Sequence, residues 1–266
     1  MTIPPSDIAK FAADLITAEA TQKQIRMITH MYPEATLEDA YAIQRDVIRQ
    51  KLDQGRRKIG WKIGLTSKAM QMALNIDIPD SGVLLDDMAF DTGSVIPKNR
   101  FIQPRVEAEI AFVMKSDLAG DTITRDDVIA ATDYVAPSLE ILDTRILRLD
   151  PETQKTRTVV DTIADNAANA GIVLGNQCHA IDAFDLRWCG AIVKKNGAVE
   201  ETGLGAGVLD DPIESVVWLA RRMHEYGDKI SAGDIILSGS FIRPIEATPG
   251  SVITAEFGTF GAVTIE

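Results

Sequence analysis

Two glutamates separated by a single residue lie in the segment RVEAEIAFVM, residues 105–114. Polar and apolar residues alternate along it, which predicts a β-strand with Glu107 and Glu109 on one face. Ala111 and Val113 follow on that same face, so the charged pair lies beside buried structure. Two interpretations stay open. The pair belongs to a solvent-exposed strand face, or it converges on a cation, because unpaired carboxylates that close repel each other.

A third carboxylate, Glu140, stands inside the apolar run at residues 135–142. A buried carboxylate costs free energy unless it is paired or bound to a metal. Pairing with Arg145 or Arg148 is one interpretation. If the two segments form neighbouring strands, the three glutamates instead make an oxygen-ligand site that suits Mg²⁺ or Mn²⁺. Zn²⁺ fits poorly, because no histidine or cysteine is placed to assist.

Lys62 and Asp80 are candidates for proton transfer. Lys62 lies among apolar residues in GWKIGLTSKAM, where a lysine is either exposed to solvent or held for electrostatic or acid–base work. Gly60 and Gly64 beside it allow a ligand to approach the backbone. Asp80 stands in a Pro-Asp-Ser-Gly sequence typical of a turn, in which an aspartate often only satisfies the backbone.

Several further residues are candidates for holding an anionic substrate. The stretches at residues 161–171 and 238–244 are small and polar, and they either pack tightly or present hydroxyl and N–H donors to a carboxylate. The net charge of −12 means that an anionic ligand needs local cations, although an isolated arginine is often a plain surface residue. The candidate substrate contacts are Leu85, Thr162, Ser240, Arg157 and Arg243.

The elements that position these residues follow from hydrophobic periodicity and capping residues. A helix is predicted over residues 6–20, and a longer one over residues 36–55, where Thr36 and Asp39 form a capping-box pattern. The later chain is richer in strands and turns. There we predict strands at residues 57–63, 105–114 and 133–142, the last broken near Pro137; a short helix from Thr124 to Ala131; a hairpin at Asn196-Gly197; and a helix from Asp211 to Gly227.

The pattern predicts an α+β fold, a mixed β-rich body with an N-terminal helical lobe. We expect a mainly helical lobe at residues 1–75 and a β-rich catalytic body at residues 76–266, acting as one functional unit. The acidic net charge argues against nucleic acid and anionic membranes as partners. The two cysteines are expected to be buried reduced thiols. Without a signal peptide or a long apolar run, we expect a cytoplasmic location.

Six short motifs follow one another over most of the chain, and each of them alone is weak. Taken in order, they resemble the hydratase/decarboxylase branch of the fumarylacetoacetate hydrolase superfamily. The motifs are KIGLTS, PDSG, VEAEIAFV, PSLEILD, DTIADNAANAG and GSFIRP.

The resemblance implies a fumarylacetoacetate-hydrolase-like fold and a divalent-metal site, usually Mg²⁺, with Mn²⁺ as an alternative. The metal ligands map onto Glu107, Glu109 and Glu140, and active-site residues map onto Lys62 and Asp80. The implied partners are a small-molecule 2-oxo dicarboxylate substrate, further copies of the chain in a homo-oligomer, and a decarboxylase of the same pathway.

Within the branch, the segments YPEATLEDAYAIQRD, GLTSKAMQ, DPETQKTR and DTIADNAANAG look most like hydratases of 2-oxo dicarboxylates. A 4-oxalocrotonate-type decarboxylase and a 2-hydroxypentadienoate hydratase are alternatives that use the same metal chelate. Hydrolysis of a C–C bond is less favoured, because that reaction resembles chemistry in which a His–Glu pair activates water, and no histidine stands in a motif. A non-enzymatic alternative is a metal-containing subunit that binds carboxylates or serves in assembly.

Overall fold

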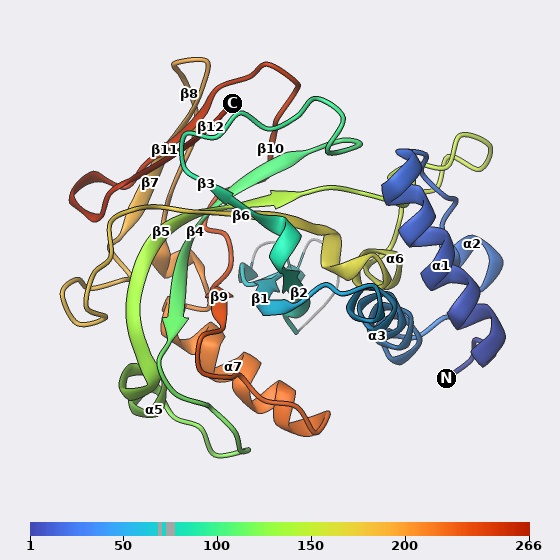
Figure 1. Ribbon diagram of the computed structural model, residues 1–266, viewed down its shortest axis with the longest axis horizontal. Coiled ribbons are helices and arrows are strands. Elements are labelled where there is room, and N and C mark those ends of the chain that lie inside the picture. The colour runs from blue at the N-terminus through green and yellow to red at the C-terminus, as the bar shows by residue number, and fades with distance from the viewer. Residues whose placement is uncertain (69–70, 73–77) are drawn as a thin grey trace.

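The computed structural model describes residues 1–68, 71–72 and 78–266. Helices α1 and α3 pack together at one end of the molecule, and α7 lies below the curved strands of the body (Figure 1). Within the described residues the α-helices are α1 (Pro5–Thr21), α2 (Ile28–Met31), α3 (Leu37–Asp53), α5 (Arg125–Ala131), α6 (Val159–Ala164) and α7 (Pro212–Glu225).

The N-terminal lobe is built on α1 and α3. The Thr36 hydroxyl accepts a hydrogen bond from the Asp39 N–H, and the Asp39 carboxylate accepts one from the Thr36 N–H, which begins α3. The apolar stripes of the two helices meet in a buried cluster that includes Phe11 and Ile43 and reaches Ile163 of α6. The lobe thereby packs against the segment that carries the DTIADNAANAG motif.

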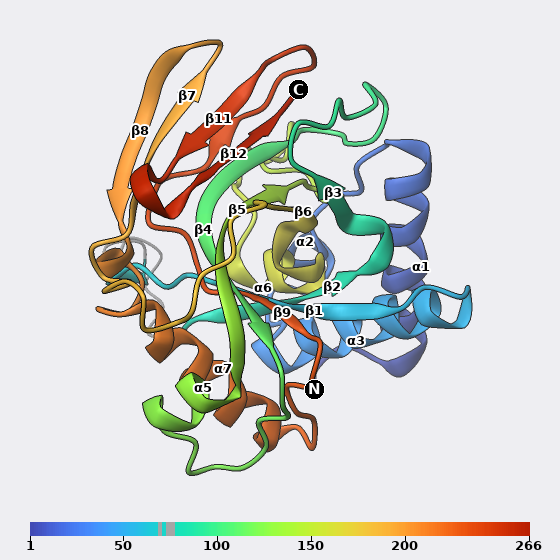
Figure 2. The same ribbon diagram turned by 60° about the vertical axis from the view of Figure 1, so that its left-hand side comes forward.

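A mixed sheet of eight strands forms the body, in the order β2-β1-β9-β4-β5-β6-β3, with β10 paired to β4. The antiparallel strands β4 and β5 are long and strongly curved, so they wrap around the centre of the molecule (Figures 1 and 2). The strands are β1 (Lys58–Gly64), β2 (Asp80–Leu85), β3 (Ala89–Asp91), β4 (Arg105–Met114), β5 (Thr132–Leu142), β6 (Asn169–Leu174), β9 (Ile235–Leu237) and β10 (Ile245–Glu246).

A second, antiparallel sheet of four strands lies beside the curved pair and is seen clearly in Figure 2. Its order is β12-β11-β7-β8, and the β7–β8 hairpin turns at Asn196 and Gly197, both in the left-handed region that this turn requires. The strands are β7 (Gly190–Lys195), β8 (Ala198–Leu204), β11 (Ile253–Glu256) and β12 (Ala262–Ile265).

The two faces of β4 have different surroundings. Val106 and Phe112 on one face are fully buried in the main hydrophobic core. Glu107 and Glu109 project from the other face, and Ala111 follows them into a small apolar cluster. That cluster explains why the charged pair is followed by apolar residues on the same face. Its other buried members are Leu84, Ile172 and Leu237.

Most of the elements predicted from the sequence are confirmed, and two expectations are wrong. Strand β5 is continuous through Pro137, and the predicted break is absent. The N–H group that proline lacks would point just beyond the last residue of β6, at the place where the Pro137 carbonyl accepts a hydrogen bond from the Gly175 N–H. Of the two free cysteines, Cys189 is buried as expected, but Cys178 is exposed in the loop between β6 and β7.

The division of the chain at residue 75 stays a prediction, since residues 73–77 lie outside the described part. Strand β1, which precedes that boundary, lies between β2 and β9 in the main sheet of the body. Within the described residues, no helix is both long and apolar enough to cross a membrane.

A left-handed turn joins α6 to β6. Three successive residues, Asn166, Ala167 and Ala168, have φ values of 52°, 52° and 60°, a conformation that costs roughly 1–2 kcal/mol for each residue with a Cβ. The Asn166 side chain stabilises the turn: its Oδ1 accepts from the Val83 N–H at 2.8 Å, and its Nδ2 donates to the Val83 carbonyl at 2.9 Å. The turn is thereby fastened to β2.

Replacing Asn166 by alanine should destabilise the protein strongly. The two buried main-chain groups of Val83 lose their partners, and each loss costs about 1–3 kcal/mol. Urea unfolding of Asn166→Ala, with Asn99→Ala at an exposed position as control, measures the change in the free energy of unfolding. Equal midpoints for the two variants would contradict this assignment.

Candidate metal and substrate site

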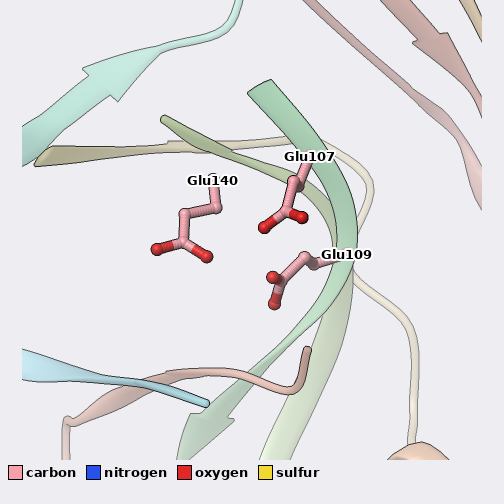
Figure 3. Close-up of side chains that lie close together, drawn as sticks. All are labelled: Glu107, Glu109 and Glu140. Carbon is pink, nitrogen blue, oxygen red and sulfur yellow. The ribbon is translucent and has the colours of Figure 1, made fainter. Parts of the chain in front are cut away.

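The register of β4 and β5 brings the three glutamates together. Glu107 pairs directly with Glu140 across the two strands, and Glu109 lies two residues further along the same face of β4. One carboxylate oxygen from each residue lies within 4.8 Å of the others. In Figure 3 the three side chains point toward a common space between the strands. The two segments that carry the glutamates therefore form neighbouring strands, as the metal-site interpretation requires.

The interpretation of the pair as a solvent-exposed strand face is wrong. Glu109 and Glu140 are buried, and Glu107 is partly buried at the wall of a cavity. The Glu109 Oε1 and Glu140 Oε2 atoms have no hydrogen-bond partner among the described residues. Buried carboxylate oxygens without partners are unfavourable unless a ligand satisfies them.

Burial and mutual repulsion raise the pKa values of the three glutamates. Burial, and then the charge of Glu140, raise the pKa of Glu107 to about 8. Burial and the charges of Glu140 and Glu107 raise the pKa of Glu109 well above its ordinary value, and burial raises that of Glu140. Each carboxyl group therefore holds its proton more firmly than a free glutamate does, and a bound cation would oppose this effect.

Lys62 and Asp80 complete the buried charge cluster. The Lys62 Nζ lies 3.6 Å from the Glu140 Oε1 and 3.8 Å from the Asp80 Oδ1. Burial opposes the charge on Lys62, but Glu140, Asp80 and the strand glutamates outweigh it and raise the lysine's pKa. The solvent-exposed alternative for Lys62 is therefore wrong. The turn expected at Asp80 is wrong too, because Asp80 is a buried residue at the start of strand β2.

Arg145 and Arg148 bind other carboxylates, so the alternative in which either of them pairs with Glu140 is wrong. Arg145 forms a buried ion pair with Asp165, its Nε lying 2.5 Å from Oδ1, and Arg148 pairs with Glu246. Glu140 instead accepts a hydrogen bond from Asn169 Nδ2 at 3.2 Å.

Two supporting contacts were not predicted. The Gly239 N–H donates to Glu109 Oε2 at 2.7 Å, and Asn169 Nδ2 holds Glu140. Both residues lie in the small, polar stretches at residues 161–171 and 238–244, but no spacing rule indicates which donor in them faces a carboxylate. Outer hydrogen bonds of this kind orient carboxylates that ligate a metal.

A cavity of about 420 Å³ opens beside the glutamates. It is lined by Lys62, Asp80 and Glu107, and by four of the five candidate substrate contacts. Leu85 is the exception, because its side chain is fully buried in the main hydrophobic core. The four that line the cavity are Thr162, Ser240, Arg157 and Arg243.

The donor set fits a hard divalent cation. All three convergent side chains offer carboxylate oxygens, two of those oxygens lack partners, and neither histidine nor cysteine belongs to the cluster within the described chain. Oxygen-only coordination by a few carboxylates, with open positions toward a cavity, is typical of Mg²⁺ and Mn²⁺ sites.

Comparison with known proteins identifies the fold and the family. The chain is 51% identical to 2-oxo-hept-4-ene-1,7-dioate hydratase of Escherichia coli over 253 residues, 95% of each chain. The structure of 4-oxalocrotonate decarboxylase from Pseudomonas putida G7, complexed with magnesium and adipate, matches with a TM-score of 0.93 and 34% identity, covering 100% of this chain and 98% of that one. No protein-family model matches the chain.

A more distant structure, a putative fumarylacetoacetate hydrolase family protein from Yersinia pestis CO92, shares the fold at a TM-score of 0.57 and 15% identity, covering 79% of this chain and 92% of that one. The chain thus has the α+β fold of fumarylacetoacetate-hydrolase-like proteins. The chain belongs to the family that comprises 2-oxo-hept-4-ene-1,7-dioate hydratase and 4-oxalocrotonate decarboxylase.

Removing the hydrogen bond from Asn169 to Glu140 should weaken metal binding. Loss of an outer-shell partner typically lowers metal affinity about 10–100-fold. Calorimetric titration of Mg²⁺ into metal-free Asn169→Ala measures this loss, with the exposed Asn176→Ala as control. An unchanged dissociation constant would show that Asn169 does not position the ligand.

The metal-free protein should lose stability as the pH rises from about 4.5 to about 8, the ordinary and the raised pKa of Glu107. Between these values the folded state retains a proton that the unfolded state has released, so the free energy of unfolding falls with pH. Urea unfolding in EDTA at pH 5 and pH 8 tests the sign, and added Mg²⁺ should oppose the loss. A metal-free Glu107→Gln variant should show a smaller change; a change as large as that of the wild type would exclude Glu107 as its source.

Proposed function

We propose that this enzyme adds water to 2-oxo-hept-4-ene-1,7-dioate and gives 4-hydroxy-2-oxoheptanedioate, in the breakdown of homoprotocatechuate, with Mg²⁺ held by Glu107, Glu109 and Glu140. The convergence of three carboxylates, two of them buried, beside a cavity that Lys62 and Asp80 also line carries the proposal. The 51% identity to the hydratase of that name over 95% of both chains supports the choice of substrate.

The chemistry requires charge stabilisation at one end of the substrate. A divalent cation bound by the glutamates supplies Lewis-acid stabilisation of negative charge on the C2 oxygen. The chain's own residues have a separate task. Lys62 is held as an ammonium by the surrounding carboxylates, so it stabilises the bound carboxylate or enolate and is a source of a proton.

Proton transfer along the substrate chain involves Lys62 and Asp80. Loss of a proton from C3 converts the substrate to its dienol. The dienol gains a proton at C5 and loses the proton of its 2-hydroxyl group, which gives a conjugated enone, and water then adds its hydroxyl group at C4 and a proton at C3. The Asp80 Oδ1 has no hydrogen-bond partner among the described residues, and Asp80 lines the cavity, so it is available to exchange a proton there. Lys62 and Asp80 together provide a proton donor and a proton acceptor.

A decarboxylase of the same branch is the second candidate, since the 4-oxalocrotonate decarboxylase structure covers the whole chain at a TM-score of 0.93. It would use the same chelate but release CO₂. Product analysis separates the two: a hydroxylated product without CO₂ supports the hydratase, and CO₂ release supports the decarboxylase.

We propose that the bound metal is Mg²⁺ in preference to Mn²⁺. We also propose that the protein is cytoplasmic, forms a homo-oligomer and associates with a decarboxylase of its pathway. Assembly is supported by exposed apolar side chains along one hollow of the second sheet, where Trp188 is 74% exposed and Leu204 45% exposed. Patches of this kind are typical of protein–protein contacts.

The protein with Mg²⁺ should consume 2-oxo-hept-4-ene-1,7-dioate, and EDTA should stop the reaction. Lys62→Met should lower kcat about 10²–10⁴-fold, the usual contribution of a positioned acid–base group. Glu140→Ala should abolish turnover through loss of a metal ligand. Ultraviolet absorbance of the substrate and chromatography of the product measure both effects. Turnover that persists in EDTA, or an active Glu140→Ala variant, would overturn the metal-dependent mechanism.

A further inference from the structure

The basic residues that line the cavity differ in whether they are neutralised. The Arg105 Nε lies 2.6 Å from Glu246, the Arg243 Nε lies 2.6 Å from Glu201, and Lys62 lies among the acidic groups of the metal site. Arg157 also lines the cavity, but no carboxylate of the described chain forms an ion pair with it.

Arg157 is held in place by a neutral side chain. Its Nη1 donates to the hydroxyl oxygen of Thr144 at 2.6 Å. The Thr144 hydroxyl donates its own proton to the Ile146 carbonyl, so its lone pairs are free to accept from the arginine. Thr144 is buried just beyond the end of β5, whereas Glu140 lies within that strand. Thr144 therefore holds the guanidinium at the wall of the cavity that Glu107 also lines.

The segment that carries Arg157 is an ordered loop. Leu149 and Thr156 form an antiparallel bridge, and the Arg157 N–H donates to the Arg148 carbonyl at 3.0 Å. Asp150 closes the turn by accepting two backbone N–H groups, and Arg26 of the N-terminal lobe binds the same carboxylate at 2.9 Å. A cation held this firmly loses little conformational entropy when it binds an anion.

The charges around Arg157 favour an anion beside it. Burial, together with repulsion from Arg148, Arg145 and Arg105, lowers the pKa of the Arg157 guanidinium, although Asp165 opposes this. Asp165 is itself bound to Arg145 at 2.5 Å. A carboxylate placed against Arg157 would relieve the repulsion and gain two parallel hydrogen bonds from the fork of the guanidinium.

We propose that Arg157, positioned by Thr144, binds the carboxylate at the far end of the substrate and thereby selects 2-oxo dicarboxylates over 2-oxo monocarboxylates. This inference rests on the proposed function, which places the 2-oxo acid end of the substrate at the glutamates. Arg243 is a poorer candidate, because Glu201 already neutralises it and its side chain is 61% exposed.

Two unreactive analogues test the selection directly. 2-Oxoheptanedioate and 2-oxoheptanoate lack the double bond and differ only in the far carboxylate. With Mg²⁺ present, calorimetry on the wild type should show about 10–100-fold tighter binding of the dicarboxylate, as expected for a charged hydrogen-bonded pair. Arg157→Met should remove this ratio and leave the affinity for 2-oxoheptanoate unchanged. The exposed Arg187→Met, whose partner is Asp185, is the control and should keep the ratio.

Thr144→Val tests the positioning role, because valine keeps the shape and removes the acceptor. It should lower the dicarboxylate ratio less than Arg157→Met does, again without changing the affinity for 2-oxoheptanoate. Equal affinities of the wild type for both analogues, a ratio retained in Arg157→Met, or a ratio lost in Arg243→Met would each overturn the assignment of Arg157. Hydration of the unsaturated substrate by the wild type tests the proposed function separately. The enzyme can hydrate this substrate even if it binds the dicarboxylate and monocarboxylate analogues equally well.

Discussion

The arrangement of the whole site depends on the repulsion among buried carboxylates. Glu107, Glu109, Glu140 and Asp80 all act on one ammonium group, that of Lys62. If all four are ionised, a single lysine leaves a large excess of negative charge in a poorly solvated space, which a protein tolerates only with another cation or with protonation. A divalent cation between the strands removes most of that excess, and the remaining charge explains why an anionic substrate needs separate basic residues.

The fold holds this unfavourable arrangement in place through strand pairing and core packing. Strands β4 and β5 pair along their whole length, so the register that sets Glu107 opposite Glu140 cannot slip without exposing the core residues of the other face. The loop after β9 supplies the Gly239 N–H, and β6 begins with Asn169, which holds Glu140. The helical lobe packs on α6 and so supports the left-handed turn that leads into β6.

The sequence predicted most of the elements and marked the three glutamates as unusual, because both depend on local rules. Alternation in residues 105–114 places two glutamates on one face, and Glu140 in an apolar run is anomalous without a partner. The register between the strands, the continuity of β5 at Pro137 and the donors Gly239 and Asn169 depend on contacts between distant segments, which no local pattern encodes. Leu85 shows the same limit, since its position near Asp80 in the chain does not bring its side chain to the cavity.

Anomalous diffraction from crystals soaked in Mn²⁺ tests the metal site most directly. The charge balance described above predicts one strong peak at the manganese absorption edge, within coordination distance of an oxygen from each of Glu107, Glu109 and Glu140. Density at that position without an anomalous signal, or a peak bound elsewhere with the three carboxylates unligated, would contradict it.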